Sequence, residues 1–168
     1  MQHIVSLSHK RNMKKGYSLV ELMVTISIVG ILVSFGVSAY GRGRDRQEGR
    51  AAGEQIIGFL SENQKKANIG DRDCAGLYRG QDISLSGTSI TAKSKCSNAG
   101  VDEFGTTDTV TISGISTMDT GTILFSPLSQ GATISPDPLR INYTTTSGTR
   151  YMVEVTSAGT IDYKGVQP

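Results

Sequence analysis

The chain has 168 residues, enough for about one domain, and its apolar fraction of 37% allows a core without indicating a protein that crosses a membrane many times. The formal net charge is +2, but the first 16 residues hold four basic side chains and no acid, so thirteen basic and fifteen acidic residues remain beyond them. A globally basic protein that coats nucleic acid is therefore not indicated.

The usage of histidine and cysteine argues against an enzyme. His3 and His9 both fall in the same N-terminal stretch, so the rest of the chain lacks the side chain most used for acid and base catalysis near neutral pH. Two cysteines without histidine are too few for a zinc cage. No Gly-rich phosphate loop, nucleophile elbow or metal-binding helix motif occurs. We therefore expect no enzymatic activity, no cofactor and no metal.

The first predicted element is an apolar helix over residues 17–40, in which Glu21 is the one charged residue. At ~1.5 Å per residue such a helix is roughly 36 Å long, which is enough to cross a hydrocarbon core of about 30 Å. A secretory signal peptide is the alternative interpretation, but it requires small residues at a cleavage site after the apolar run, and Ser38-Ala39-Tyr40 is a poor one.

Two features of this helix bear on how it would pack. The carboxylate of Glu21 would cost up to ~2.5–3.5 kcal/mol at mid-membrane, so it needs a partner, or a place in the first turn from which it reaches the headgroups. Gly30, Ser34 and Ser38 recur at every fourth residue and form a stripe of small side chains that would let a second helix approach closely. Small residues are also frequent in any membrane helix.

Residues 14–24, KKGYSLVELMV, resemble the prepilin processing motif of type IV pilin-like proteins. The resemblance implies that prepilin peptidase cuts after Gly16, that the new N-terminus at Tyr17 is methylated, and that Glu21 is retained for assembly. It also implies that the leader, residues 1–16, is cytoplasmic.

Two positions depart from the family's usual pattern. Tyr17 stands where the family usually has Phe, and Ser38 stands where major pilins commonly have a kinking proline, which points away from a major pilin.

The helical pattern continues over residues 41–68. One face carries Ala52, Ile56, Phe59, Leu60, Asn63 and Ala67. We expect this amphipathic half to lay that face on a sheet and to end at about Ala67. Gly41, Gly43 and Gly49 mark its weakest part, because each costs about 1 kcal/mol relative to Ala. The arginines between residues 42 and 50 could contact lipid headgroups or DNA phosphate, but interspersed acids favour a solvated or lipid-adjacent helix face.

Residues 69–168 are rich in Gly, Ser and Thr and predict a β-rich head. The expected strands are 77–85, 88–95, 109–115, 122–126, 139–145, 151–156 and 160–163. Ser86-Gly87 predicts the turn of a first hairpin. Cys74 and Cys96 would lie just outside its two ends, and a disulfide is the expected state outside the cytosol, with a reduced pair as the alternative.

The head is similar to those of minor pilins and pseudopilins of the secretion-protein H and FimT kind, which supports an α+β fold with a helix packed on antiparallel strands. The acids of residues 71–73 and 102–108 could contribute to a calcium site, but turn formation explains them better.

The function that we expect is that of a structural subunit of a type IV pilus-like filament, in a chain with one membrane pass and its head outside. Its partners would be other pilin subunits, prepilin peptidase, membrane lipid and the inner-membrane assembly platform. The alternatives are an adhesin or DNA-uptake receptor at a filament tip, a type II secretion pseudopilin, and a plain single-pass surface protein. DNA is a possible partner that nothing in the sequence supports.

Overall fold

The computed structural model describes residues 17–167; the expected leader, residues 1–16, lies outside the described residues, as do the side chains of residues 36–39 and 42. The chain divides into two compact units at the boundary between Gly41 and Arg42. Helix α1 (Leu19–Ile69) belongs to both units, and the second unit also contains all the strands. We call this second unit the head.

Helix α1 is 51 residues long and ends two residues later than the predicted Ala67. Its end is a Schellman cap, in which Gly70 has a φ of 72°. The N–H of Gly70 donates to the carbonyl of Ala67 at 3.2 Å, and the N–H of Asp71 donates to the carbonyl of Lys66 at 2.9 Å. Glycine accommodates this left-handed conformation without a clash, so the helix stops there.

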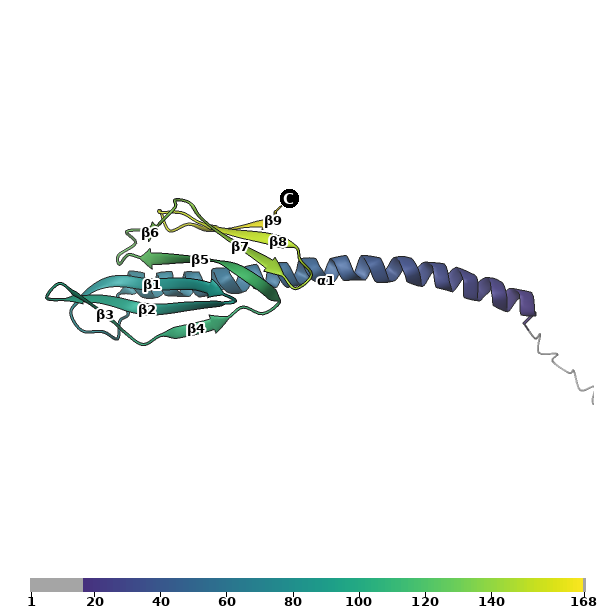
Figure 1. Cartoon of the computed structure of the whole chain (residues 1–168), viewed down its shortest axis with the longest axis horizontal. Coiled ribbons are helices and arrows are strands. Elements are labelled where there is room, and N and C mark those ends of the chain that lie inside the picture. Colours follow the sequence, from purple (N-terminus) through teal and green to yellow (C-terminus); the bar gives the residue numbers. More distant parts are fainter. Residues whose placement is uncertain (1–16, 168) are drawn as a thin grey trace, which may run out of the picture. The chain divides into compact units, whose positions relative to one another are not determined.

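Among the described residues, nine antiparallel strands form one sheet in the head, in the order β3-β2-β1-β5-β7-β8-β9, with β4 also paired to β2 and β6 to β5. Figure 1 shows that these strands lie against the C-terminal part of α1. The α+β class predicted from the sequence is confirmed. The strands are β1 (Leu77–Gly87), β2 (Ser89–Asn98), β3 (Val101–Phe104), β4 (Asp108–Thr111), β5 (Ile115–Phe125), β6 (Ala132–Ile134), β7 (Leu139–Thr145), β8 (Arg150–Val155) and β9 (Ile161–Val166).

Several predicted strand boundaries were wrong. The strands β3 and β6 were not predicted, and the strand expected over residues 122–126 is the end of the much longer β5. The first hairpin turns at Gly87-Thr88, because Ser86 pairs with Ser89. Gly87 has a φ of 61° and stands at the first central position, where a two-residue turn of type II′ requires glycine.

Strand β5 joins the two halves of the sheet. Its residues from Met118 onward pair with β1, whereas Ile115 to Met118 pair with β7. Beyond Met118, β5 and β7 are connected through a side chain. The carboxylate of Asp119 accepts hydrogen bonds from the backbone N–H of Asn142 at 3.2 Å and from its side-chain amide at 2.8 Å. The sequence predicts separate strands on either side of this point because residues 117–121 are mostly polar.

The core lies between α1 and the facing side of the sheet. The predicted helix face is buried at Ala52, Ile56, Leu60, Asn63 and Ala67, but Phe59 is half-buried and lies at its margin. Gly49 and Gly53 are also buried on this face. The sheet contributes alternating residues of its strands to the same core, among them Ile83, Ile90, Ile123, Phe125, Ile141, Tyr143, Tyr151, Val153 and Val155.

Candidate functional site

The start of α1 carries the residues that the sequence predicts for processing and assembly. Tyr17 lies two residues before the helix and is 85% exposed, and Glu21 lies exposed in the first turn. Within the part of the chain that the structure describes, Glu21 makes no hydrogen bond or ion pair. Gly16, on the other side of the expected cleavage point, lies outside the described residues.

The first part of α1 presents apolar side chains all round. From Tyr17 to Phe35 every described side chain is exposed, and each of the large apolar ones is more than half exposed. The hydroxyls of this segment donate to its own carbonyls: Thr25 to Leu22 at 2.9 Å, Ser27 to Met23 at 2.8 Å and Ser34 to Gly30 at 2.9 Å. These bonds satisfy the hydroxyl donors inside the helix, so the carboxylate of Glu21 is the strongly polar group left on this surface.

The predicted small-residue stripe is open at the positions that are described. A Cβ placed on Gly30 would meet nothing within 4 Å, and Ser34 folds its hydroxyl back onto the helix. The side chain of Ser38 lies outside the described residues. Among the residues described, no helix has the combination of length and apolar character required to pass through a membrane.

A family model of the prokaryotic N-terminal methylation motif matches residues 11–37. The matched segment contains three of the four basic residues of the expected leader, together with Gly16, Tyr17 and Glu21. This match supports a type IV pilin-like prepilin. The motif implies membrane anchoring before assembly into a filament. Neither the curated proteins nor the solved structures include one that matches this chain.

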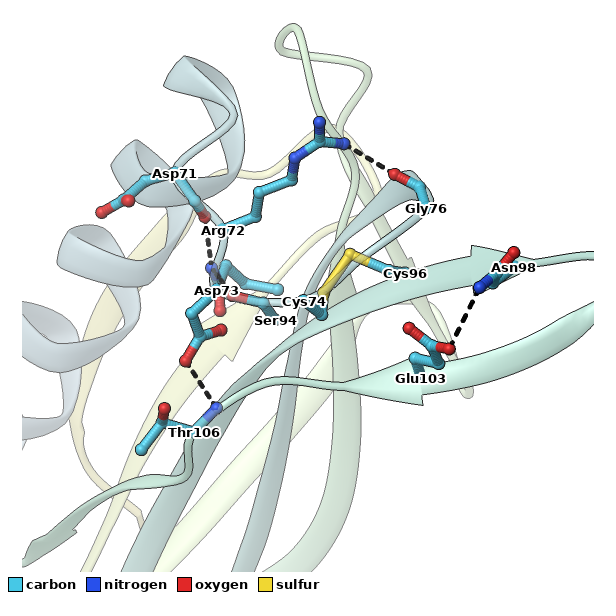
Figure 2. The surroundings of a disulfide bond; sticks show 11 residues. Asp71, Arg72, Asp73, Cys74, Gly76, Ser94, Cys96, Asn98, Glu103 and Thr106 are labelled. Atoms are coloured by element: carbon cyan, nitrogen blue, oxygen red, sulfur yellow. Dashed lines mark hydrogen bonds between the residues drawn. A yellow bond between two sulfur atoms is a disulfide. The ribbon is translucent and has the colours of Figure 1, made fainter.

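In the head, Cys74 and Cys96 form a disulfide with their Cα atoms 6.0 Å apart (Figure 2). Cys74 lies in the loop between α1 and β1, but Cys96 lies within β2 rather than beyond its end, because β2 continues to Asn98. Tyr78 of β1 is the residue paired with Cys96. The disulfide therefore fastens the loop after α1 to the second strand of the hairpin.

Hydrogen bonds hold the same loop at both sides of the disulfide (Figure 2). The guanidinium of Arg72 donates to the carbonyl of Gly76 at 2.8 Å, and the backbone N–H of Thr106 donates to the carboxylate of Asp73. The hydrogen bonds from Thr106 hold the pKa of Asp73 below its ordinary value. The side-chain amide of Gln81 also donates to the carbonyl of Asp71 at 3.1 Å.

The acids considered for a calcium site are dispersed among other partners. Asp73 binds Thr106, Asp102 pairs with Lys95 at 2.8 Å, and Asp108 lies 3.6 Å from the ammonium of Lys66. No group of three or more metal-binding side chains is found in the part of the chain that the structure covers. These acids fasten loops and strands.

The sequence did not single out Asp45, which lies among the arginines at the start of the head. Its carboxylate accepts hydrogen bonds from the hydroxyls of Thr145, Ser147 and Thr149 around the turn between β7 and β8. The bonds from Ser147 and Thr149 hold the pKa of Asp45 below its ordinary value. The sequence contains hydroxyl side chains at the alternate positions 145, 147 and 149, but it does not indicate which acid lies opposite them.

Two of the neighbouring arginines form ion pairs along the helix. Arg44 pairs with Glu48 at 2.7 Å and Arg50 pairs with Glu54 at 2.9 Å, each one turn apart. Such exposed pairs contribute at most about 0.5 kcal/mol. This arrangement favours the solvated helix face over a cationic binding surface.

Proposed function

We propose that the prepilin is a structural subunit of a type IV pilus-like filament, cut after Gly16 and held in the membrane by residues 17–40 until it assembles. The observation that carries this proposal is the combination of a methylation motif over residues 11–37 with an exposed apolar helix directly after the cut. An apolar surface of this extent requires either lipid or neighbouring helices to cover it.

We propose that Glu21 gives the assembly its specificity. Packing and polar contacts must select partners within a membrane, because lipid tails are as apolar as the helix itself. A carboxylate without a partner in that setting gains from an opposite charge, and a cut after Gly16 creates one at the amine of Tyr17. The amine of a neighbouring subunit would then attract Glu21 into register.

The head would be carried outside the membrane. Its core is formed by the second half of α1 and the sheet. Two cysteines form a disulfide within the head, and this bond suits the head to an oxidising compartment. A filament subunit needs no catalytic group, and we propose a purely structural role. A tip adhesin, a DNA-uptake receptor and a secretion pseudopilin would share this anatomy.

The mass of the mature protein tests the processing step. We expect the membrane form to begin at Tyr17 with one added methyl group. Tandem fragmentation should place that methyl group on the N-terminal amine. A mature N-terminus beyond Ser38 would instead identify an ordinary secretory signal and would exclude the proposed anchor.

Incorporation of Glu21→Ala tests the assembly step. We expect normal cleavage and a folded head but less protein in the filament fraction than in the membrane pool, because the attraction to the neighbouring amine is lost. Glu62→Ala is the control, since Glu62 is 61% exposed in the head and pairs with Lys66 along one helix turn. Equal incorporation of the two variants would show that helix packing alone assembles the filament.

A further inference from the structure

We infer that Asp45 anchors α1 to the β7–β8 hairpin and stops any unwinding of the preceding helix from passing into the head. The anchor consists of Asp45 and the hydroxyls of Thr145, Ser147 and Thr149. Its geometry lies wholly within the head. Its mechanical role rests on the proposed filament function, in which tension acts along α1.

The carboxylate of Asp45 is held by donors from one short turn. Thr145 donates to it at 2.9 Å and Thr149 at 2.6 Å, and the hydroxyl of Ser147 completes the set. The turn is itself closed, because the backbone N–H of Thr145 donates to the carbonyl of Thr149 at 2.9 Å. Hydroxyls fixed by a closed turn lose little freedom on binding, and bonds to an ionised acceptor are stronger than neutral ones.

Two further contacts continue the anchor along the same face of the helix. The hydroxyl of Tyr151 donates to the backbone carbonyl of Asp45 at 3.3 Å, and the hydroxyl of Tyr143 donates to the carbonyl of Gly49 at 2.8 Å. The rings of these two tyrosines stack with their centroids 5.7 Å apart. Positions 45 and 49 are one helical turn apart, so the hairpin grips two successive turns.

Among the described residues, the two glycines just before Asp45 pack against nothing. A Cβ on Gly41 or on Gly43 would meet nothing within 4 Å, and both glycines favour the unwound state over the helix. Unwinding can therefore begin at these glycines at little cost. To continue past Asp45, it must break three hydrogen bonds to a carboxylate and separate Gly49 from Tyr143.

Hydrogen exchange of the full chain in detergent micelles tests the anchor. We expect Asp45→Ala to increase the exchange rate of the amides of residues 46–53 by at least about tenfold, which corresponds to the loss of about 1.4 kcal/mol of local stability. Exchange in β1 and β2 should stay unchanged, because the opening is local. The exchange rate of residues 46–53 in Asp45→Asn should lie between those of the native chain and Asp45→Ala, since an amide oxygen still accepts a hydrogen bond from one of the hydroxyls.

A pair of threonine variants keeps the test decisive if Asp45→Ala does not fold. Thr149→Val removes one donor of the anchor and should increase exchange in residues 46–53. Thr146→Val is the matched control, because Thr146 is exposed in the same turn and its hydroxyl has no partner among the described residues. Equal exchange for both variants, or a rise spread evenly over the whole head, would overturn the anchor. Neither the exchange of the Asp45 variants nor that of the threonine variants depends on filament formation.

Discussion

Glycine has opposite roles at neighbouring positions of α1. Gly49 is buried, and a Cβ there would overlap the ring of Tyr151, while a Cβ on Gly53 would lie 2.6 Å from the hydroxyl of Tyr143. The two glycines thus let the helix backbone approach the tyrosines closely. Gly49 was predicted to be a weak point of the helix together with Gly41 and Gly43, and for Gly49 that prediction was wrong because the sheet covers it.

An alanine pair tests this distinction. Gly49→Ala should reduce the free energy of unfolding by about 1–3 kcal/mol, because the added methyl group must displace a packed ring. Gly58→Ala should increase it by about 0.5–1 kcal/mol, since Gly58 is exposed in the same helix and a Cβ there meets nothing within 4 Å. Urea unfolding of both variants gives the two values. A stabilising Gly49→Ala would contradict the packing.

Asp45 should make the head sensitive to acid. Its pKa is lowered in the folded state, so it contributes stability above its ordinary pKa of 3.8, and this contribution is lost as the pH falls through the lower, folded value. Asp45→Asn should therefore be less stable than the native chain at pH 7, and the difference should shrink as the pH falls below 3.8. Thermal unfolding measured across this range checks it, and a difference that widens in acid would contradict the sign.

At the scale of elements, the loop between α1 and β1 is held in place by a disulfide and by side-chain hydrogen bonds. Residues 70–76 have no strand or helix of their own and are held by the disulfide, by Arg72 and by Asp73. The disulfide closes a segment with a sequence separation of 22 residues. A loop of this size should restrict the unfolded chain by about 3 kcal/mol in the chain-entropy account.

Reduction should therefore lower the thermal midpoint of the head. We expect the native chain with reductant to unfold at the same thermal midpoint as a Cys74→Ser, Cys96→Ser double variant. Reductant should not change the midpoint of the double variant. Calorimetry with and without reductant gives the comparison. An unchanged midpoint of the native chain, with free thiols shown by alkylation, would mean that the bond adds nothing to stability.

At the scale of the whole molecule, the head is a folding unit that includes the second half of α1. The buried core draws on residues 52–155, and the chain divides just before Arg42. A fragment of residues 42–168 should therefore unfold cooperatively, with the same midpoint as the head of the full chain. A fragment of residues 50–168 lacks Asp45 and Gly49 and should unfold at a lower temperature. Circular dichroism measures both, and equal midpoints would show that the first turns of the head's helix add no stability.

The local chemistry of the chain was sufficient to predict much of the molecule. Periodicity of 3.6 residues located the buried face from Ala52 to Ala67, and runs of β-branched residues located β7 and β8 closely. The prepilin motif lies in consecutive residues around Gly16 and Tyr17, so it could be read without a structure. These signals are local, and the sequence alone determined them.

Contacts between distant residues had to come from the tertiary structure. The partners of Asp45 lie 100 or more residues away, and the overlap that requires glycine at position 49 exists only once Tyr151 packs on the helix. The strand β5 crosses a polar stretch because β1 and β7 pair with its two ends, which overrides the weak local preference for strand. The sequence by itself determined where the methylation motif lies and where the helix is apolar. Only the tertiary structure decided how the head holds that helix, because a carboxylate or a glycine gains its role from the groups that folding brings to it.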